Sequence, residues 1–183
     1  MTDQTLPRTA LVVGGARSGK SRFAEILAEN SGLQKIYVAT GAAHDGEMAE
    51  RIALHRDQRG PSWETIEEQL DLAGVLSRQC RPDRVVLVDC LTLWLSNILF
   101  ADKDLSLETE RLCAAVRRLD GPCVFVSNEV GMGIVPENRL SRSFRDAQGR
   151  LNQSMAGVCQ KVVFVAAGLP LLLKPSSQPE ISL

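Results

Sequence analysis

The stretch Gly14-Gly15-Ala16-Arg17-Ser18-Gly19-Lys20-Ser21 fits the pattern G-x-x-x-x-G-K-[ST], which is typical of loops that bind nucleotide phosphates. An apolar, β-branched run at 9–13 precedes it and indicates a buried strand, and the residues that follow it indicate a helix. Such glycines let backbone N–H groups point inward, and the helix N-terminus adds partial positive charge. Lys20 can then reach the β- and γ-phosphates, and Ser21 can bind Mg²⁺. An ordinary glycine turn before a helix is the weaker alternative.

Short apolar segments alternate with helical patterns along the rest of the chain. The expected strands or extended segments cover residues 9–14, 35–40, 62–67, 84–89, 123–127, 161–166 and 171–173. The expected helices cover residues 19–30, 47–58, 70–79, 91–100, 106–119 and 138–160, with Ser106 as a helix cap. This alternation predicts an α/β fold with a mostly parallel sheet flanked by helices. We expect one nucleotide-binding domain over 1–183, with mobile ends at 1–8 and 175–183.

The composition excludes several classes of protein. A net charge of −1 gives no basic field that would draw the chain to nucleic acid. No apolar run is long enough to span a membrane, and residues 1–8 lack the apolar region of a signal peptide. The 5 cysteines are odd in number and form no C-x-x-C pair, which argues against zinc and against a disulfide framework. We therefore expect a cytoplasmic protein with free thiols.

Ligands of sheets built in this way bind at the carboxyl ends of the strands. This rule selects the loop at 14–21, the segment 39–41, Asp89 and the pair Asn128-Glu129. Asp89 follows four apolar residues, which is the expected setting for the carboxylate that holds the nucleotide's Mg²⁺. A role as N-cap of the helix from 91 onward remains the alternative for Asp89.

Two other residues could carry chemistry. His55 has Arg51 one helical turn before it and Arg56 and Arg59 after it, and such arginines would keep an imidazole neutral and bind phosphates. A neutral histidine can form a covalent intermediate. Glu67 could accept hydrogen bonds from guanine or from ribose hydroxyls. From these residues alone, a surface histidine among solvated arginines and an exposed glutamate remain the simpler interpretations.

Several segments together resemble one enzyme family. They are Tyr37-Val38-Ala39-Thr40, Glu47-Met48-Ala49-Glu50-Arg51-Ile52 with His55-Arg56, Trp63-x-Thr65-x-Glu67, Val88-Asp89-Cys90-Leu91-Thr92, the run from Asn128 to Asn138, Arg145-Asp146, and Gly149-Arg150-x-Asn152-Gln153. With the glycine loop they resemble the bifunctional adenosylcobinamide kinase / adenosylcobinamide-phosphate guanylyltransferases of cobalamin biosynthesis, over about residues 11–174. The run Asn-Glu-Val-Gly-Met-Gly-Ile-Val-Pro at 128–136 is the most specific part of this resemblance.

The resemblance implies a P-loop NTPase fold of the RecA-like kind, a homotrimer and two reactions. A nucleoside triphosphate, ATP or GTP, phosphorylates adenosylcobinamide. GMP then passes from GTP through a guanylylated His55 to adenosylcobinamide phosphate, giving adenosylcobinamide-GDP and pyrophosphate. The residues implied in catalysis are His55 and Lys20, and those implied in binding Mg²⁺ are Ser21 and Asp89. The implied nucleotide contacts are Gly14, Gly15, Ala16, Arg17, Ser18, Gly19, Lys20, Ser21, Ala39, Thr40, Gly41, Arg56, Asp57, Gln58, Arg59, Glu67 and Asp89.

Two other functions are compatible with the glycine loop. A small-molecule kinase without guanylyl transfer would use the loop and would not need His55. A nucleotide-dependent switch would bind a protein partner, but the chain lacks the N-K-x-D pattern that reads guanine in common GTPases. The sequence leaves open which triphosphate the kinase step prefers, where the corrinoid binds and which group, if any, serves as the kinase base.

Overall fold

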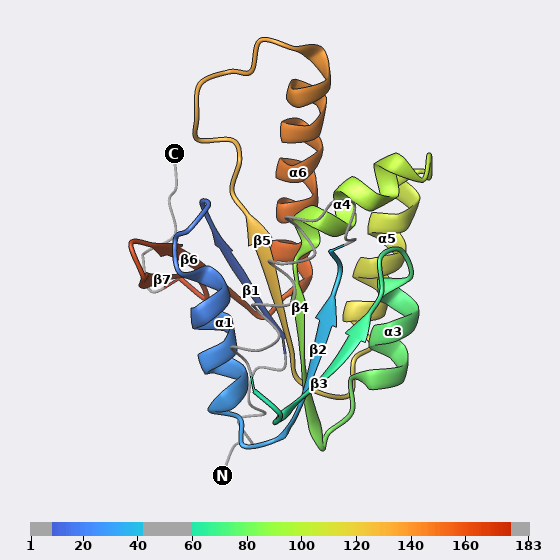
Figure 1. The fold of residues 1–183 in the computed structure, drawn as a ribbon, viewed down its shortest axis with the longest axis vertical. Helices are drawn as coiled ribbons and strands as arrows, with labels where there is room; N and C mark the ends of the chain where they lie inside the picture. The colour runs from blue at the N-terminus through green and yellow to red at the C-terminus, as the bar shows by residue number, and fades with distance from the viewer. Residues whose placement is uncertain (1–8, 42–59, 177–183) are drawn as a thin grey trace.

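A seven-stranded sheet forms the centre of the computed structural model, which describes residues 9–41 and 60–176 (Figure 1). The strand order is β3-β2-β4-β5-β1-β6-β7. Every neighbouring pair is parallel except the edge pair β6–β7, which is antiparallel. The strands are β1 (Thr9–Gly14), β2 (Gln34–Ala39), β3 (Trp63–Glu67), β4 (Arg84–Asp89), β5 (Cys123–Asn128), β6 (Lys161–Ala166) and β7 (Leu169–Lys174).

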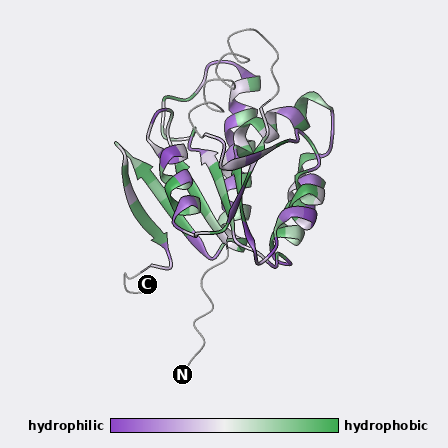
Figure 2. Ribbon diagram, turned by 60° about the horizontal axis from the view of Figure 1, so that its bottom comes forward, coloured by the Kyte–Doolittle hydropathy of each residue, from purple (hydrophilic) through white to green (hydrophobic). Residues whose placement is uncertain are grey.

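Helices cover both faces of the sheet. They are α1 (Lys20–Glu29), α3 (Leu72–Gln79), α4 (Leu91–Phe100), α5 (Leu105–Val116) and α6 (Arg139–Val158). Alternate strand residues point to opposite faces, so Leu11 packs in the core beneath α3 to α6 and Val12 packs in the core beneath α1. The central strands carry apolar residues along most of their length, seen as green strand segments in Figure 2, and both of their faces are buried. The predicted α/β class with a mostly parallel sheet is confirmed.

The structure corrects some expected boundaries. The N-cap of α5 is Asp104 rather than Ser106, because Asp104 accepts hydrogen bonds from the main-chain N–H groups of Ser106 (2.9 Å) and Leu107 (3.1 Å). The expected edge strand at 171–173 begins earlier, with Leu169 and Pro170. The expected helix at 47–58 and the chain ends 1–8 and 177–183 lie outside the described residues. Within the described ranges, no helix has the length and apolar character needed to cross a membrane.

Candidate nucleotide-binding site

The carboxyl ends of the parallel strands bring the predicted site residues to one side of the sheet, which we call the carboxyl edge. In the strand register, Ala39 lies opposite both Glu67 and Asp89. Gly14 lies opposite Asn128 on the next pair of strands. Because β5 lies between β1 and β4, the glycine loop and Asp89 flank the end of β5. The described part of the predicted site is therefore a single edge of the sheet.

The loop at 14–21 has the compact geometry that its glycines predict. Gly19 has a φ of 92°, in the left-handed region that glycine adopts without strain. A side chain at Gly14 would collide with Ser18 Oγ and the carbonyl of Val165, since a Cβ there would lie 2.5 Å from each. The main-chain N–H of Gly168, in the turn between β6 and β7, donates to the carbonyl of Ser18 at 2.8 Å. The turn between β6 and β7 therefore supports the glycine loop through this hydrogen bond.

Lys20 begins α1 and is almost fully buried, with 9% of its surface exposed. Its Nζ donates to the carbonyl of Gly15 at 3.1 Å, which directs the ammonium back over the loop. An ammonium directed over the loop gives this position the positive charge that a phosphate anion binds. Ser18 Oγ is also buried, and it has no hydrogen-bond partner among the described residues.

The helices differ in how their N-termini are satisfied. Side chains cap α3, α5 and α6, namely those of Asp71, Asp104 and Asn138. In the part of the chain that the structure describes, no side chain caps α1 or α4, the helices that begin in the glycine loop and just after Asp89. The first N–H groups of a helix need an acceptor, and a phosphate is a suitable one. These two uncapped helices therefore favour an anionic ligand at the carboxyl edge.

Asp89 is not the N-cap of α4, because the cap position is Cys90, which makes no side-chain capping bond. Among the described residues, neither the Asp89 carboxylate nor the Ser21 hydroxyl has a side-chain hydrogen bond or ion pair. Two uncommitted oxygen donors are the type of ligand that Mg²⁺ accepts. Burial and then the Asp89 carboxylate raise the pKa of the Cys90 thiol to about 11, while the Lys20 ammonium acts to lower it. The charges of Lys20 and Asp89 therefore both act on this thiol, in opposite directions.

Thr40 joins two of the strand ends. Its hydroxyl donates to the carbonyl of Cys90 at 2.7 Å and accepts from the N–H of Cys90 at 2.8 Å. Asn97 of α4 donates to the carbonyl of Thr40 at 2.7 Å. The Thr40 side chain is fully buried, so it holds the end of β2 against the segment that follows Asp89. Sequence reasoning expected Thr40 as a nucleotide contact and did not anticipate this clasp.

The remaining predicted residues fall into two groups. Glu67 is exposed at the end of the edge strand β3, and three strands lie between β3 and β1. His55 and the predicted contacts Arg56, Asp57, Gln58 and Arg59 lie outside the described residues. Their roles therefore stay predictions.

A buried polar network at the end of β5 was not anticipated either. Asn152 of α6 accepts hydrogen bonds from Ser127 Oγ (2.6 Å) and from Gln148 Nε2 (3.0 Å). Asn152 also donates to the carbonyl of Asn128 at 3.0 Å, and Thr92 accepts from the N–H of Asn128 at 2.9 Å. The polar residues at helical spacing within the helix predicted at 138–160 were the available signal. The network fixes the strand end beside the glycine loop.

Comparison with known proteins places this geometry in a family. The family model described as cobinamide kinase / cobinamide phosphate guanyltransferase matches residues 10–173. The chain belongs to this family. It is 50% identical over 166 residues to the bifunctional adenosylcobalamin biosynthesis protein CobP of Pseudomonas aeruginosa, covering 90% of this chain and 96% of that protein. It is 42% identical over 179 residues to the corresponding CobU protein of Escherichia coli, covering 90% of this chain and 98% of that protein.

Solved structures agree on the fold of this cobinamide kinase / guanyltransferase family member. An ATPase from a bacterial type III secretion system matches with a TM-score of 0.52 and 9% sequence identity, over 86% of this chain and 50% of that one. This likeness concerns the fold alone. It agrees with the predicted α/β fold with a mostly parallel sheet.

Proposed function

We propose that this chain performs both reactions of its family. It phosphorylates the aminopropanol hydroxyl of adenosylcobinamide from a nucleoside triphosphate, and it then transfers GMP from GTP to the new phosphate, releasing pyrophosphate. The observation that carries the proposal is the match of residues 10–173 to a family with both activities. The uncapped start of α1 beside the buried Lys20 supports it, because both reactions need a bound triphosphate.

The carboxyl edge supplies what phosphoryl transfer requires, which is mainly positioning and neutralisation of charge. Main-chain N–H groups of the glycine loop and of the first turn of α1 hold the phosphates. The Lys20 ammonium stabilises the negative charge that develops on the transferred phosphoryl group. Ser21 and Asp89 supply the oxygen ligands for Mg²⁺, which when bound neutralises the β- and γ-phosphates.

His55 is the proposed nucleophile of the second reaction. Its imidazole nitrogen attacks the α-phosphorus of GTP, a nitrogen–phosphorus bond forms, and pyrophosphate leaves. The phosphate of adenosylcobinamide phosphate then displaces the histidine. Arg56 and Arg59 are the proposed partners of the transferred phosphate, and Glu67 is the proposed acceptor for guanine or ribose.

Labelling with α-³²P-GTP tests this assignment. The wild-type protein and His44→Ala, the matched control at the other histidine, should retain label after denaturation at alkaline pH, and His55→Ala should not. His55→Ala should still phosphorylate adenosylcobinamide. Label on His55→Ala would contradict the assignment of His55 as the nucleophile. If the wild type released no pyrophosphate from GTP in the presence of adenosylcobinamide phosphate, the alternative function, a kinase without guanylyl transfer, would hold instead.

The setting in the cell and the assembly are also proposals. We place the enzyme in the cytoplasm as a homotrimer that acts on adenosylcobinamide, its phosphate, ATP and GTP. Four exposed leucines on the edge strand β7 offer an apolar surface for contact between copies, namely Leu169, Leu171, Leu172 and Leu173. Light scattering that gave the mass of a monomer at micromolar concentration would contradict the trimer.

A further inference from the structure

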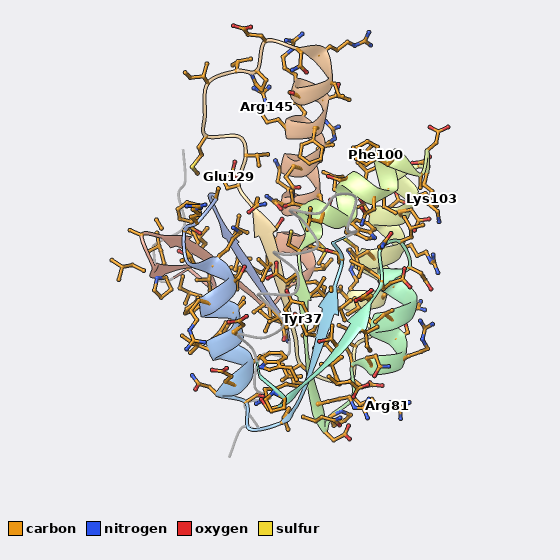
Figure 3. The ribbon with its side chains drawn as sticks, in the orientation of Figure 1. Tyr37, Arg81, Phe100, Lys103, Glu129 and Arg145 are labelled. Atoms are coloured by element: carbon orange, nitrogen blue, oxygen red, sulfur yellow. The ribbon has the colours of Figure 1, made fainter. Side chains whose placement is uncertain are left out.

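Glu129 is the residue that brings a further carboxylate to the glycine loop. It follows β5 directly, and its main-chain N–H donates to the carbonyl of Gly14 at 3.0 Å. Gly14 is the first residue of the loop, so Glu129 lies against the loop itself. Figure 3 shows the Glu129 side chain near the carboxyl ends of β1 and β5. By contrast, β5 separates Asp89 from β1, and Glu67 lies on the far edge strand.

Hydrogen bonds from two helices hold the main chain next to Glu129 in place. Its neighbour Asn128 is held by Thr92 of α4 through its N–H (2.9 Å) and by Asn152 of α6 through its carbonyl (3.0 Å). Asn152 is itself bonded to Ser127 and Gln148, both of which are fully buried. A group held by two helices in this way keeps its place while a reaction proceeds, as catalytic groups must.

The Glu129 carboxylate is oriented through one oxygen. Oε1 accepts from the main-chain N–H of Gly131 at 2.5 Å. A side chain at Gly131 would approach Oε1 to 2.9 Å, so glycine leaves room for this contact. Among the described residues, Oε2 has no hydrogen bond, and no lysine or arginine pairs with the carboxylate. One oxygen is therefore anchored and the other is available to a ligand on the loop.

The first reaction needs an acceptor for one proton. The hydroxyl of the acceptor loses its proton when its oxygen attacks the γ-phosphorus. In the second reaction the attacking atoms are the unprotonated imidazole nitrogen of His55 and then a phosphate oxygen, and neither carries such a proton. The group required must stand beside the loop, must not be a metal ligand and must not be neutralised by a cation. Of the carboxylates at the ends of β3, β4 and β5, Glu129 meets these conditions.

We propose that Glu129 is the general base of the kinase step, an inference that rests on the proposed kinase function. The acceptor hydroxyl oxygen forms a bond to the γ-phosphorus, and the bond between this phosphorus and the β,γ-bridging oxygen breaks. The hydroxyl proton passes to Oε2 of Glu129, and the electron pair of the broken bond leaves with the nucleoside diphosphate. Glu129 takes no part in the transfer of GMP.

Measuring the two reactions separately tests this role. One assay follows phosphorylation of adenosylcobinamide by ATP, and the other follows GMP transfer to adenosylcobinamide phosphate prepared beforehand. Glu129→Gln should lower the kcat of the first by about 100-fold or more. The KM for ATP and the rate of the second reaction should stay within about 3-fold of the wild type. Glu137→Gln is the matched control, because Glu137 is an exposed glutamate in the same segment between β5 and α6. It should leave both rates unchanged.

Chemical rescue separates a base from a residue that only shapes the loop. Formate should restore part of the kinase rate of Glu129→Ala and should leave Glu129→Gln unchanged, because only the first variant has room for a small carboxylate. Undiminished phosphorylation by Glu129→Gln, or an equal loss of both reactions, would overturn the role of Glu129. A wild-type enzyme that transfers GMP but never phosphorylates adenosylcobinamide would overturn the kinase assignment and this role with it.

Discussion

The two ends of the parallel strands carry reactive side chains in opposite environments. At the carboxyl edge, the side-chain oxygens of Asp89 and Ser21 have no partner among the described residues, and they lie beside two helices that no described side chain caps. Towards the amino ends of the strands, the thiols of Cys80, Cys123 and Cys159 are packed into the core. Burial raises the pKa of Cys159 to about 12 and, together with the Cys80 thiol, raises that of Cys123.

This difference shows that residue type alone does not mark a functional site. A cysteine thiolate is a stronger nucleophile than a carboxylate or a hydroxyl, but a thiol held protonated inside a core cannot react. At the carboxyl edge, by contrast, the described residues leave donors and acceptors without partners, and a bound nucleotide would satisfy them.

Replacing Lys20 tests whether the carboxyl edge serves both reactions. Lys20→Ala removes the charge over the loop, so we expect both phosphoryl and guanylyl transfer to fall by about 100- to 1,000-fold. Lys35→Ala is the matched control, since Lys35 lies over the Trp63 ring (5.8 Å) near the start of β2, and it should change neither rate. Steady-state kinetics of each reaction would check this, and a Lys20→Ala variant active in either reaction would separate the two sites.

Much of this edge could be predicted from the sequence because its signals are local. The glycine loop is a contiguous motif, and Asp89 and Glu67 stand where apolar strands end. The order of the strands is not local, and it decides that Glu129 rather than Asp89 adjoins Gly14. The Thr40 clasp was missed for the same reason, since its partner Cys90 is 50 residues away.

Removing the Thr40 hydroxyl should weaken the carboxyl edge through the loss of its two hydrogen bonds with Cys90. In Thr40→Val, the N–H and the carbonyl of Cys90 lose their buried partner, which should lower the free energy of unfolding by about 2 kcal/mol or more. Activity should fall with it, because the segment after Asp89 is released. Thr65→Val on the edge strand β3 is the control and should cost less. Denaturant unfolding measures both, and equal stability of the two variants would show that the clasp contributes nothing.

Changes at the amino ends of the strands should alter how stability depends on pH and should leave activity unchanged. The Cys159 thiol has an ordinary pKa of 9.0 in the unfolded chain and a pKa of about 12 in the folded protein, chiefly because of burial. A raised pKa means that its stabilising contribution is complete below pH 9 and is lost as the pH rises towards 12. From pH 8 to pH 10.5 the free energy of unfolding should drop by about 2 kcal/mol through this thiol. Cys159→Ala should lose that part of the dependence and keep both activities, whereas an unchanged pH dependence would mean that the thiol ionises as freely in the core as in water.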